Sequence, residues 1–263
     1  MIKKIIVFLL KPIFGRLAWQ NFFEFIHYIG IRGMHFGQGA FVGESGERYV
    51  ISYLKKKSEK DLILFDVGGN IGKYSIVLNE IIPQNRIIYA FEPSKVTSQK
   101  FIENTKTIPN LILNNIGLSD KKCELDLFYD AETSGLSSVY QRDLNHVNIS
   151  MAKSEKVNLE RLDDFCNQNN IDRIDLLKID VEGHELSVLN GCGKLLNEKK
   201  IRFIQFEFGG CNIDSRTYFK DFFNLLNPNY IIYRIIQHNM IEVKNYSELN
   251  EIFTTVNYFA ELR

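Results

Sequence analysis

The stretch LFDVGGNIGKYS, residues 64–75, decides how the rest of the chain is interpreted. An apolar run reaches Asp66, and three glycines follow before the spacing of apolar residues changes. From Tyr74 these residues recur three and four positions apart, as on one face of a helix that Pro83 would end. The pattern predicts a strand, a glycine-rich corner and a helix, the arrangement with which many α/β proteins hold a cofactor.

The order of the glycines argues against two common ligands of such corners. A phosphate-binding loop needs GxxxxGK[ST], and the interval from Gly68 to Gly72 is one residue too short. The dinucleotide fingerprint GxGxxG fails because the glycines stand in the wrong order. Asp66 would repel a pyrophosphate at the helix N-terminus and suits a positively charged ligand. S-adenosylmethionine carries a sulfonium and an ammonium group and no phosphate, so we expect it here. An ordinary tight turn is the alternative.

A second carboxylate supports the same ligand. Glu92 ends the next apolar run, 26 residues after Asp66, which is the length of one strand–helix–strand unit. An acidic residue at that position can accept hydrogen bonds from both ribose hydroxyls. The glycines would let the backbone approach the methionine end of the ligand. The residues predicted to bind the cofactor are Asp66, Gly68, Gly69, Asn70, Gly72, Tyr74, Glu92 and Pro93.

From residue 61 onward, short apolar runs alternate with helix-period segments, the pattern of a parallel sheet with crossover helices. Ser215 is expected to be the N-cap of a helix that ends near Leu226. The polar segment 131–154 has no clear period and is expected to be a long functional or mobile loop. Seven strands are predicted around one core, over residues 62–67, 86–93, 110–117, 174–180, 201–208, 230–236 and 256–262.

Composition narrows the class of protein. The 263 residues are 45% hydrophobic and contain 32 basic and 32 acidic residues, which is typical of a globular protein without charge bias. This balance of charges argues against a protein whose main function is to bind nucleic acid. The four cysteines form no CxxC pair, so we expect reduced, mostly buried thiols in a cytoplasmic protein.

The N-terminus, MIKKIIVFLLKPIFGRLAW, begins like a signal peptide, with two lysines before an apolar run, but the apolar run is shorter than that of a signal peptide. Lys11 and Pro12 stop its apolar run after six residues, Ile5 to Leu10, which is too short to cross a bilayer. We divide the chain into an N-terminal helical arm with its following loop, 1–45, and a catalytic domain, 46–263. The arm is expected to pack on the domain or on a partner subunit of an oligomer. Peripheral contact of residues 1–28 with the inner face of a membrane is the alternative.

Five motifs in this order, FDVGGNIGKYS, AFEPS, NNIGLSD, NLERLDDF and LLKIDVEGHELSVLNG, resemble the FkbM-type family of S-adenosylmethionine-dependent methyltransferases. The resemblance implies a seven-stranded Rossmann-like α/β sheet, mostly parallel with the last strand antiparallel, and helices on both faces. It also implies O-methylation of a hydroxyl, often on sugars or polyketides. The family's usual corner has alanine where this chain has Gly69. Residues 1–45 and 215–263 lie outside the defining pattern and are expected to hold the substrate preference.

The chemistry is expected where the fourth strand ends, in KIDVEGHE, because ligands of open α/β sheets lie outside the carboxyl ends of the strands. The candidate catalytic residues are Asp180, Glu182 and His184. One carboxylate would act as general base, or Asp180 would hold a Mg²⁺ ion with Glu207. His184 is either a base or a solvated loop residue. HELSV lacks the second histidine of a zinc protease helix.

The sequence therefore predicts an S-adenosylmethionine-dependent O-methyltransferase with a small-molecule or glycan acceptor. A sugar of a surface polysaccharide or its precursor is the expected substrate. One alternative is a non-catalytic scaffold of this fold in a glycan-assembly complex, anchored through the N-terminal arm. A nicotinamide-dependent reductase is a third interpretation, which the absent GxGxxG disfavours.

Overall fold

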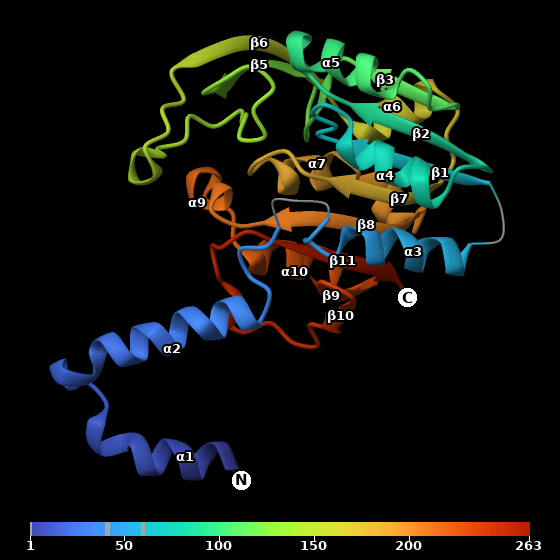
Figure 1. Cartoon of the computed structure of the whole chain (residues 1–263). Helices are drawn as coiled ribbons and strands as arrows, with labels where there is room; N and C mark the ends of the chain where they lie inside the picture. The colour runs from blue at the N-terminus through green and yellow to red at the C-terminus, as the bar shows by residue number, and fades with distance from the viewer. Residues whose placement is uncertain (1, 40–42, 59–60) are drawn as a thin grey trace.

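The computed structural model describes residues 2–39, 43–58 and 61–263, and an eight-stranded sheet forms its centre (Figure 1). The order across this sheet is β10-β9-β11-β8-β7-β1-β2-β3. Its strands are β1 (Leu62–Val67), β2 (Arg86–Phe91), β3 (Leu111–Asn114), β7 (Ile174–Ile179), β8 (Ile201–Phe208), β9 (Tyr230–Ile236), β10 (Asn239–Glu242) and β11 (Val256–Leu262).

The strand directions are those of a Rossmann-like methyltransferase sheet. Strands β3, β2, β1, β7 and β8 are parallel, and β11 lies antiparallel between β8 and β9. The predicted fold class, mostly parallel with the last strand antiparallel, is therefore confirmed. The count of seven strands is one too low, because β10 extends β9 as an antiparallel hairpin. This strand is short and mostly exposed, so it lacks the apolar run by which a buried strand is recognised.

Helices cover both faces of the sheet because successive residues of each strand point to opposite sides. Phe65 and Val67 of β1 pack in one core cluster with residues of helices α6, α7, α8 and α10. Leu62 and Leu64 pack in a second cluster with helices α3 and α4. The helices around the sheet are α3 (Glu47–Lys57), α4 (Lys73–Ile81), α5 (Lys95–Thr105), α6 (Leu162–Gln168), α7 (Glu185–Gly191), α8 (Gly193–Asn197), α9 (Cys211–Ser215) and α10 (Phe219–Leu226).

The start of α10 differs from the prediction. Ser215 is the last residue of α9 and not an N-cap, so that prediction is wrong. The first turn of α10 is capped instead by the carboxylate of Glu251, which accepts the N–H groups of Phe219 at 2.8 Å and Lys220 at 3.0 Å. Asp221 in the same turn accepts the N–H of Tyr218, the N-cap residue, at 2.9 Å, which is a local signal that the sequence prediction did not use.

A second, three-stranded sheet stands beside the carboxyl ends of the parallel strands, at the top left of Figure 1. It has the order β4-β6-β5 and consists of β4 (Gly117–Leu118), β5 (Cys123–Tyr129) and β6 (Lys153–Glu160). Between β5 and β6 the chain forms a long loop, 130–152, whose only helical turn is η3 (Asn145–Val147). The loop occupies most of the segment predicted to be functional.

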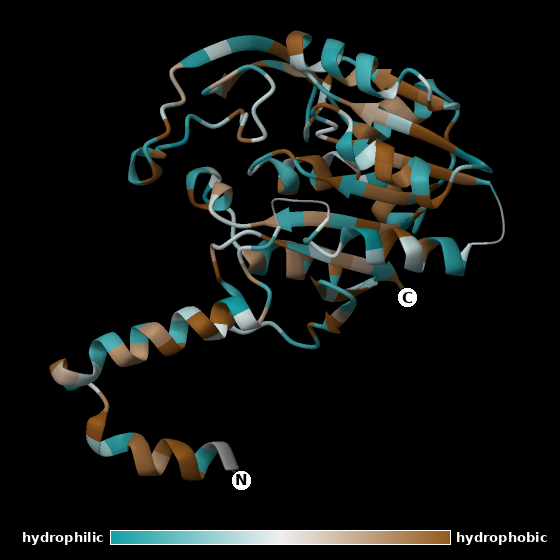
Figure 2. Ribbon diagram, in the orientation of Figure 1, coloured by the Kyte–Doolittle hydropathy of each residue, from teal (hydrophilic) through white to brown (hydrophobic). Residues whose placement is uncertain are grey.

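The N-terminal helices α1 (Ile2–Leu10) and α2 (Gln20–Gly33) project from the body as an arm (Figure 1). Short 3-10 turns η1 (Lys11–Ile13) and η2 (Leu17–Trp19) join them, and η4 (Glu248–Asn250) lies in the body. Brown apolar segments run along both arm helices without a covering layer (Figure 2). Among the described residues, we find no helix with the length and apolar character needed to cross a membrane.

Candidate active site

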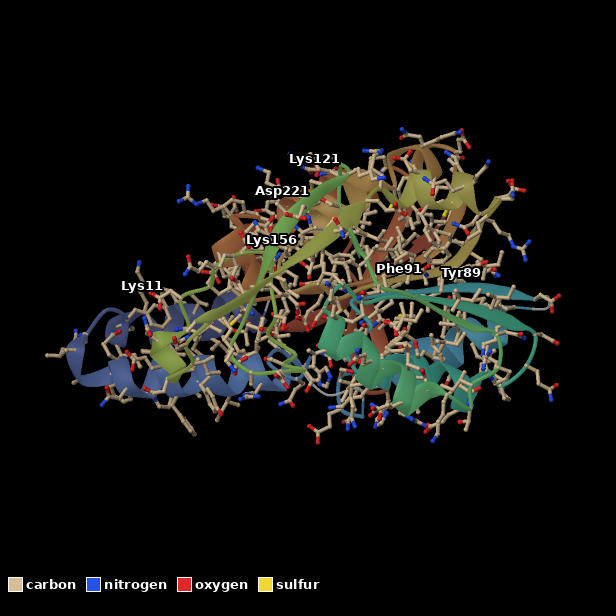
Figure 3. The ribbon with its side chains drawn as sticks, turned by 90° about the horizontal axis from the view of Figure 1, so that it is seen from above. Lys11, Tyr89, Phe91, Lys121, Lys156 and Asp221 are labelled. Atoms are coloured by element: carbon tan, nitrogen blue, oxygen red, sulfur yellow. The ribbon has the colours of Figure 1, made fainter. Side chains whose placement is uncertain are left out.

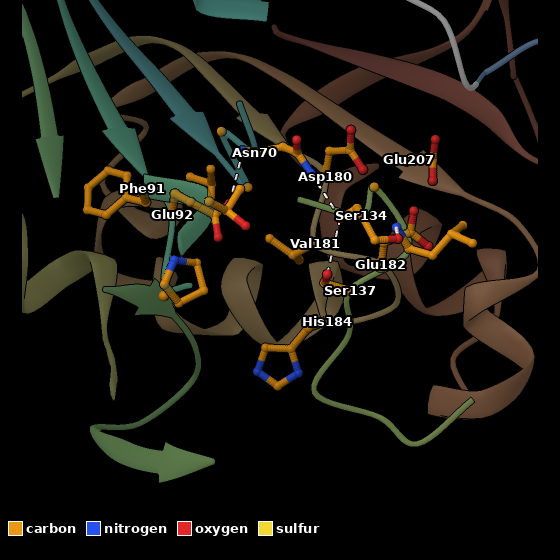
Figure 4. A pocket seen from close by; sticks show the side chains of 18 of the residues that line it. Asn70, Phe91, Glu92, Ser134, Ser137, Asp180, Val181, Glu182, His184 and Glu207 are labelled. Carbon is orange, nitrogen blue, oxygen red and sulfur yellow. Dashed lines mark hydrogen bonds between the residues drawn. The ribbon is translucent and has the colours of Figure 1, made fainter. Parts of the chain in front are cut away.

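A cavity of about 390 Å³ lies at the carboxyl ends of the parallel strands. The strand order reverses there, since β1 pairs with β2 on one side and with β7 on the other. Gly68 follows β1, Glu92 follows β2, Asp180 follows β7, and all three line the cavity. Figure 4 shows the side chains of Glu92 and Asp180 there. Ligands of open α/β sheets bind at such a switch point, and cavities of this size suit a cofactor.

The glycine corner needs its glycines for geometric reasons. Gly68 has φ +77°, and a Cβ on it would lie 1.7 Å from the carbonyl oxygen of Asp180. Gly72, with φ +87°, is the N-cap of α4 and also lies in the left-handed region. The N–H groups of Gly68 and Gly69 both donate to the carbonyl of Phe91, at 3.0 and 2.9 Å. These contacts fix the corner against the ends of β2 and β7.

Gly69 is the position where the family pattern has alanine. A Cβ there would lie 2.8 Å from the Phe101 ring, which belongs to α5. The phenyl ring therefore occupies the space that an alanine methyl would need.

Glu92 fixes the corner and faces the cavity. Its two carboxylate oxygens accept the N–H of Asn70 and the N–H of Ser94, each at 2.9 Å. Burial raises the pKa of Glu92 to about 7, although these two N–H groups lower it. Asn70 has φ +44°, and its side-chain amide donates to the carbonyl of Ser134 in the loop 130–152. Each Glu92 oxygen retains a lone pair for a ligand hydroxyl.

Asp66 and Gly72 do not line the cavity, whereas the other six residues predicted to bind the cofactor do. The side chain of Asp66 is completely buried and accepts a hydrogen bond from Ser75 at 2.7 Å. Its other oxygen lies 3.2 Å from the ammonium group of Lys178. Asp66 is therefore separated from the cavity, and it pairs with a lysine that does line the cavity.

Lys178 is a site residue that the sequence interpretation missed. Its ammonium group also lies 3.4 Å from Asp180, 3.3 Å from the carbonyl of Gly68 and 5.3 Å from the centre of the Tyr74 ring. Burial alone would lower the pKa of Lys178, but the carboxylates of Asp180, Asp66 and Glu47 raise it above the ordinary value. A lysine inside the apolar run DLLKI was the available signal, because a buried charge needs partners.

Glu47 is a second residue that sequence interpretation missed. It is the first residue of α3, it is buried, and it lines the cavity. Ser45 and Gln205 donate hydrogen bonds to its two oxygens, each at 2.8 Å, and Gln205 accepts the hydroxyl of Tyr74 at 3.0 Å. Burial raises the pKa of Glu47 to about 7. No motif marks a helix-initial glutamate twenty residues before the glycine corner.

The predicted catalytic residues Asp180, Glu182 and His184 all line the cavity, but their surroundings differ. Asp180 has a side chain that is 38% exposed and pairs with Lys178. Glu182 is paired with Arg142 of the loop at 2.5 Å, and Arg142 also lies 3.3 Å from Asp214. Burial and the charge of Asp180 raise the pKa of Glu182 to about 8.

His184 is buried and is not a solvated loop residue, so that interpretation is wrong. Its Nε2 lies 2.9 Å from the hydroxyl of Ser119, and its Nδ1 lies 3.0 Å from the hydroxyl of Tyr140. Burial lowers the pKa of His184 to about 4, so the ring is neutral at physiological pH. It joins the end of β4, the loop 130–152 and the start of α7.

Glu185 has a structural position. It is completely buried and accepts the N–H groups of Val181 and Gly183 at 3.0 Å. Burial raises its pKa to about 7. These bonds hold the turn that carries Asp180 and Glu182, in which Gly183 has φ +103°.

The donor set does not suit Mg²⁺. The group of possible ligand atoms within 4.8 Å of one another comprises Glu182, Glu207 and Cys211, without Asp180. Mg²⁺ prefers six oxygen ligands, and a thiol is a soft ligand. Burial raises the pKa of the Cys211 thiol, and Arg142 already pairs with Glu182. Asp180 is not a member of this group, and an Asp180–Glu207 metal pair remains a prediction.

The loop 130–152 closes one side of the cavity. Its residues Ser134, Ser137 and Arg142 line it, and Ser138 donates to the carbonyl of Glu182 at 2.7 Å. Figure 4 shows Ser134 and Ser137 between Glu92 on one side and Glu182 on the other. The prediction of a functional loop agrees with this position, since the loop touches both the glycine corner and the end of β7.

Sheet order, glycine corner and cavity together have the arrangement of the Rossmann-like methyltransferase fold. A model of the methyltransferase FkbM domain matches residues 66–248, which is well over half of the chain. The chain belongs to this FkbM methyltransferase family, and the resemblance noted in the sequence is confirmed.

Three methyltransferases are similar to this chain in sequence. Methyltransferase 1 of Beauveria bassiana is 30% identical over 50% of this chain and 58% of its own length. The hexuronic acid methyltransferase AglP of Haloferax volcanii is 26% identical over 62% of this chain and 64% of its own. The 2-O-methyltransferase NoeI of Sinorhizobium fredii is 27% identical over 61% of this chain and 68% of its own. The chain thus spans less than two thirds of the first two relatives.

Proposed function

We propose that this protein transfers a methyl group from S-adenosylmethionine to a hydroxyl of a sugar or another small molecule. The observation that carries the proposal is one cavity that joins the glycine corner and Glu92 to the carboxylates that follow β7 and to Glu207 near the end of β8. S-adenosylmethionine would supply an electrophilic methyl group on its sulfonium. The protein has to orient the acceptor oxygen in line with that methyl and take its proton.

The residues of the cofactor end suit this ligand. Gly68 and Gly69 let the corner pack directly against the carbonyl of Asp180 and the ring of Phe101, and both line the cavity. Glu92 has lone pairs for two ribose hydroxyls. The apolar side chains of Leu118, Leu127 and Leu159 line the cavity and would contact the adenine ring of the ligand. We propose that Asp66 acts through Lys178 and that Tyr74 and Pro93 complete the lining.

Asp180 is the general base that the surroundings favour. Its side chain is the most exposed of the three candidates, and its ion pair with Lys178, at 3.4 Å, is longer than the 2.5 Å pair of Glu182 with Arg142. Both ring nitrogens of His184 have hydroxyl partners, so His184 would first have to release one of them. We therefore propose that Asp180 takes the proton, and that Glu182 and His184 position the acceptor and the loop.

The charges at the acceptor end favour a neutral polyhydroxyl acceptor. Four carboxyl groups line this end of the cavity, from Glu47, Asp180, Glu182 and Glu207. The two cations beside them, Lys178 and Arg142, are already paired, and only Lys73 at the corner is a further cationic residue of the lining. Burial raises the pKa of Glu47 to about 7 and of Glu182 to about 8, so these groups are partly protonated near neutral pH and can donate hydrogen bonds to hydroxyl groups. An acceptor carboxylate would find no unpaired cation beside them among the described residues, so we propose a neutral sugar, for instance of a surface polysaccharide or its precursor. The 2-O-methyltransferase name of one relative agrees with a hydroxyl oxygen as acceptor, whereas the hexuronic acid methyltransferase is named for an acidic sugar.

The direct experiment is methyl transfer from radiolabelled S-adenosylmethionine to paired acceptors, neutral hexosides and the matching hexuronates. We expect label in the neutral member of each pair and little in the acidic one. Equal or preferred transfer to the hexuronate would contradict the charge argument. Binding of cofactor without transfer to any hydroxyl acceptor would favour the non-catalytic scaffold instead.

The division of the chain remains part of the proposal. We propose a catalytic domain over residues 46–263, preceded by the arm and its following loop. Phe36 is buried in the main core, whereas α2 has no buried residue. The arm proper therefore ends near Gly33, and the segment after it belongs structurally with the domain.

A further inference from the structure

The N-terminal arm, residues 1–33, has an exposed apolar surface that the body does not cover. Among the described residues, most of the large apolar side chains that are exposed lie between Ile5 and Met34. Phe8 is 75% exposed, Leu17 is 90% exposed and Phe25 is 59% exposed. Large uncovered apolar patches mark binding surfaces in folded proteins.

The apolar residues of α2 form one stripe. Phe22, Phe25, Ile26 and Ile29 recur at three- and four-residue intervals and are all exposed. The acidic residue Glu24 lies on the opposite side of the helix by the same periodicity. An apolar stripe opposite a polar face is the pattern of a helix that lies in the plane of a membrane surface.

The arm also differs from the body in charge. Residues 1–33 contain five lysines and arginines against one acidic residue, whereas the remaining chain contains 27 against 31. Aromatic residues, among them Trp19 and Tyr28, are the kind found at membrane–water interfaces. Basic residues beside apolar ones favour an anionic lipid surface. Two arms packed face to face would bring like charges together, which disfavours a second copy as the occupant.

The arm is organised and firmly attached. Phe14, in the segment between the two arm helices, packs on Phe23 of α2 with 5.6 Å between ring centres. At its root, the N–H of Gly37 donates to the carbonyl of Thr255 at 2.8 Å, and Gly39 and Thr255 both line the cavity. We propose that the arm binds the surface of a membrane containing anionic lipids and holds the protein there, with the arm joined to the body beside the cavity.

The test is sedimentation of the full chain with vesicles of phosphatidylcholine, alone and mixed with phosphatidylglycerol. We expect binding to the mixed vesicles that weakens with added salt, and about tenfold weaker binding for Lys4→Glu/Lys11→Glu. Lys121→Glu/Lys122→Glu makes the same charge change on the body and should bind like the wild type; Figure 3 shows Lys11 on the arm and Lys121 on the body.

Apolar contact is tested separately. Leu17→Asp/Phe25→Asp should abolish vesicle binding, whereas Leu249→Asp, at an 84% exposed position of the body, should not. Since the arm side chains lie outside the core, cofactor binding by each variant checks that the domain is folded. No binding of the wild type to mixed vesicles, or unchanged binding of the arm variants, would overturn the proposal. Self-association that the arm variants abolish, without vesicle binding, would assign the arm to a second copy.

Discussion

The ammonium group of Lys178 lies 3.2 Å from the completely buried carboxylate of Asp66 and 3.4 Å from Asp180 at the cavity. This lysine links the first strand, the glycine corner and the proposed base. Because Asp66 has no exposure, loss of its partner would leave an uncompensated buried charge.

We therefore expect Lys178→Met to lower the free energy of unfolding by about 3–5 kcal/mol. Asp66→Asn combined with Lys178→Met should recover part of this loss, because both charges are then removed. Lys156→Met is the matched control, since Lys156 pairs with Asp126 at the surface and should cost less than about 1 kcal/mol. Urea unfolding measures all four proteins. If Lys178→Met lowers the free energy of unfolding no more than the control does, the Asp66–Lys178 pair does not contribute to stability.

The glycine corner predicts a strong dependence on one residue. Gly68→Ala should lower the free energy of unfolding by about 3 kcal/mol or more, because of its positive φ and the overlap with Asp180. Gly193→Ala serves as the control, since a Cβ there would meet nothing within 4 Å. Chemical unfolding of both variants tests this, and a Gly68→Ala protein as stable as the control would refute the geometry of the corner.

Buried carboxyl groups predict how stability changes with pH. Burial raises the pKa of Glu47, Glu92 and Glu185 to about 7, from 4.5 in the unfolded chain. The folded state then binds more protons than the unfolded state, so the free energy of unfolding should fall as pH rises from 6.5 to 8. His184 has the opposite effect, because its pKa is lowered from 6.5 to about 4. It makes the free energy of unfolding rise with pH, mainly between pH 4 and 6.5.

Unfolding at both pH values checks this slope. Glu47→Gln removes one titrating group and should show a smaller fall, whereas Glu124→Gln, at an exposed position, should match the wild type. Stability that rises over this window in the wild type would mean that these carboxyl groups are not buried in solution.

Asp180→Asn separates binding from chemistry. It keeps the volume of the side chain but cannot take a proton, so turnover should fall about a hundredfold or more. Binding of S-adenosylmethionine should change by less than about 1 kcal/mol. Chelation by EDTA should leave the wild type active, because the donor set does not suit Mg²⁺. Asp172→Asn, at an exposed position, is the control. Near-normal turnover of Asp180→Asn would exclude Asp180 as the base.

Much of the fold could be predicted because its signals are local. The apolar runs of β1, β2, β7 and β8 and the helix period after Gly72 appear in the sequence itself. Glycines with positive φ mark the corner, and carboxylates at strand ends mark the cavity. These features depend on neighbours along the chain or on one strand–helix–strand unit.

The parts that were missed depend on contacts between distant segments. Arg142 reaches Glu182 across 40 residues, and Gln205 reaches Glu47 across 158. Asp66 was expected to face the ligand, but its burial and its pairing with Lys178 follow only from the packing of β1 beside β7. No periodicity in the sequence encodes such pairs.

The central claim is an S-adenosylmethionine site at the glycine corner, and calorimetric titration with S-adenosylhomocysteine tests it most directly. The folded wild type should bind this ligand and not NAD. Glu92→Ala should weaken the binding by about 2 kcal/mol or more, since it removes an acceptor for two ribose hydroxyls. Glu124→Ala should bind like the wild type. Failure of the wild type to bind S-adenosylhomocysteine, or equal affinity of the Glu92→Ala protein, would contradict the account.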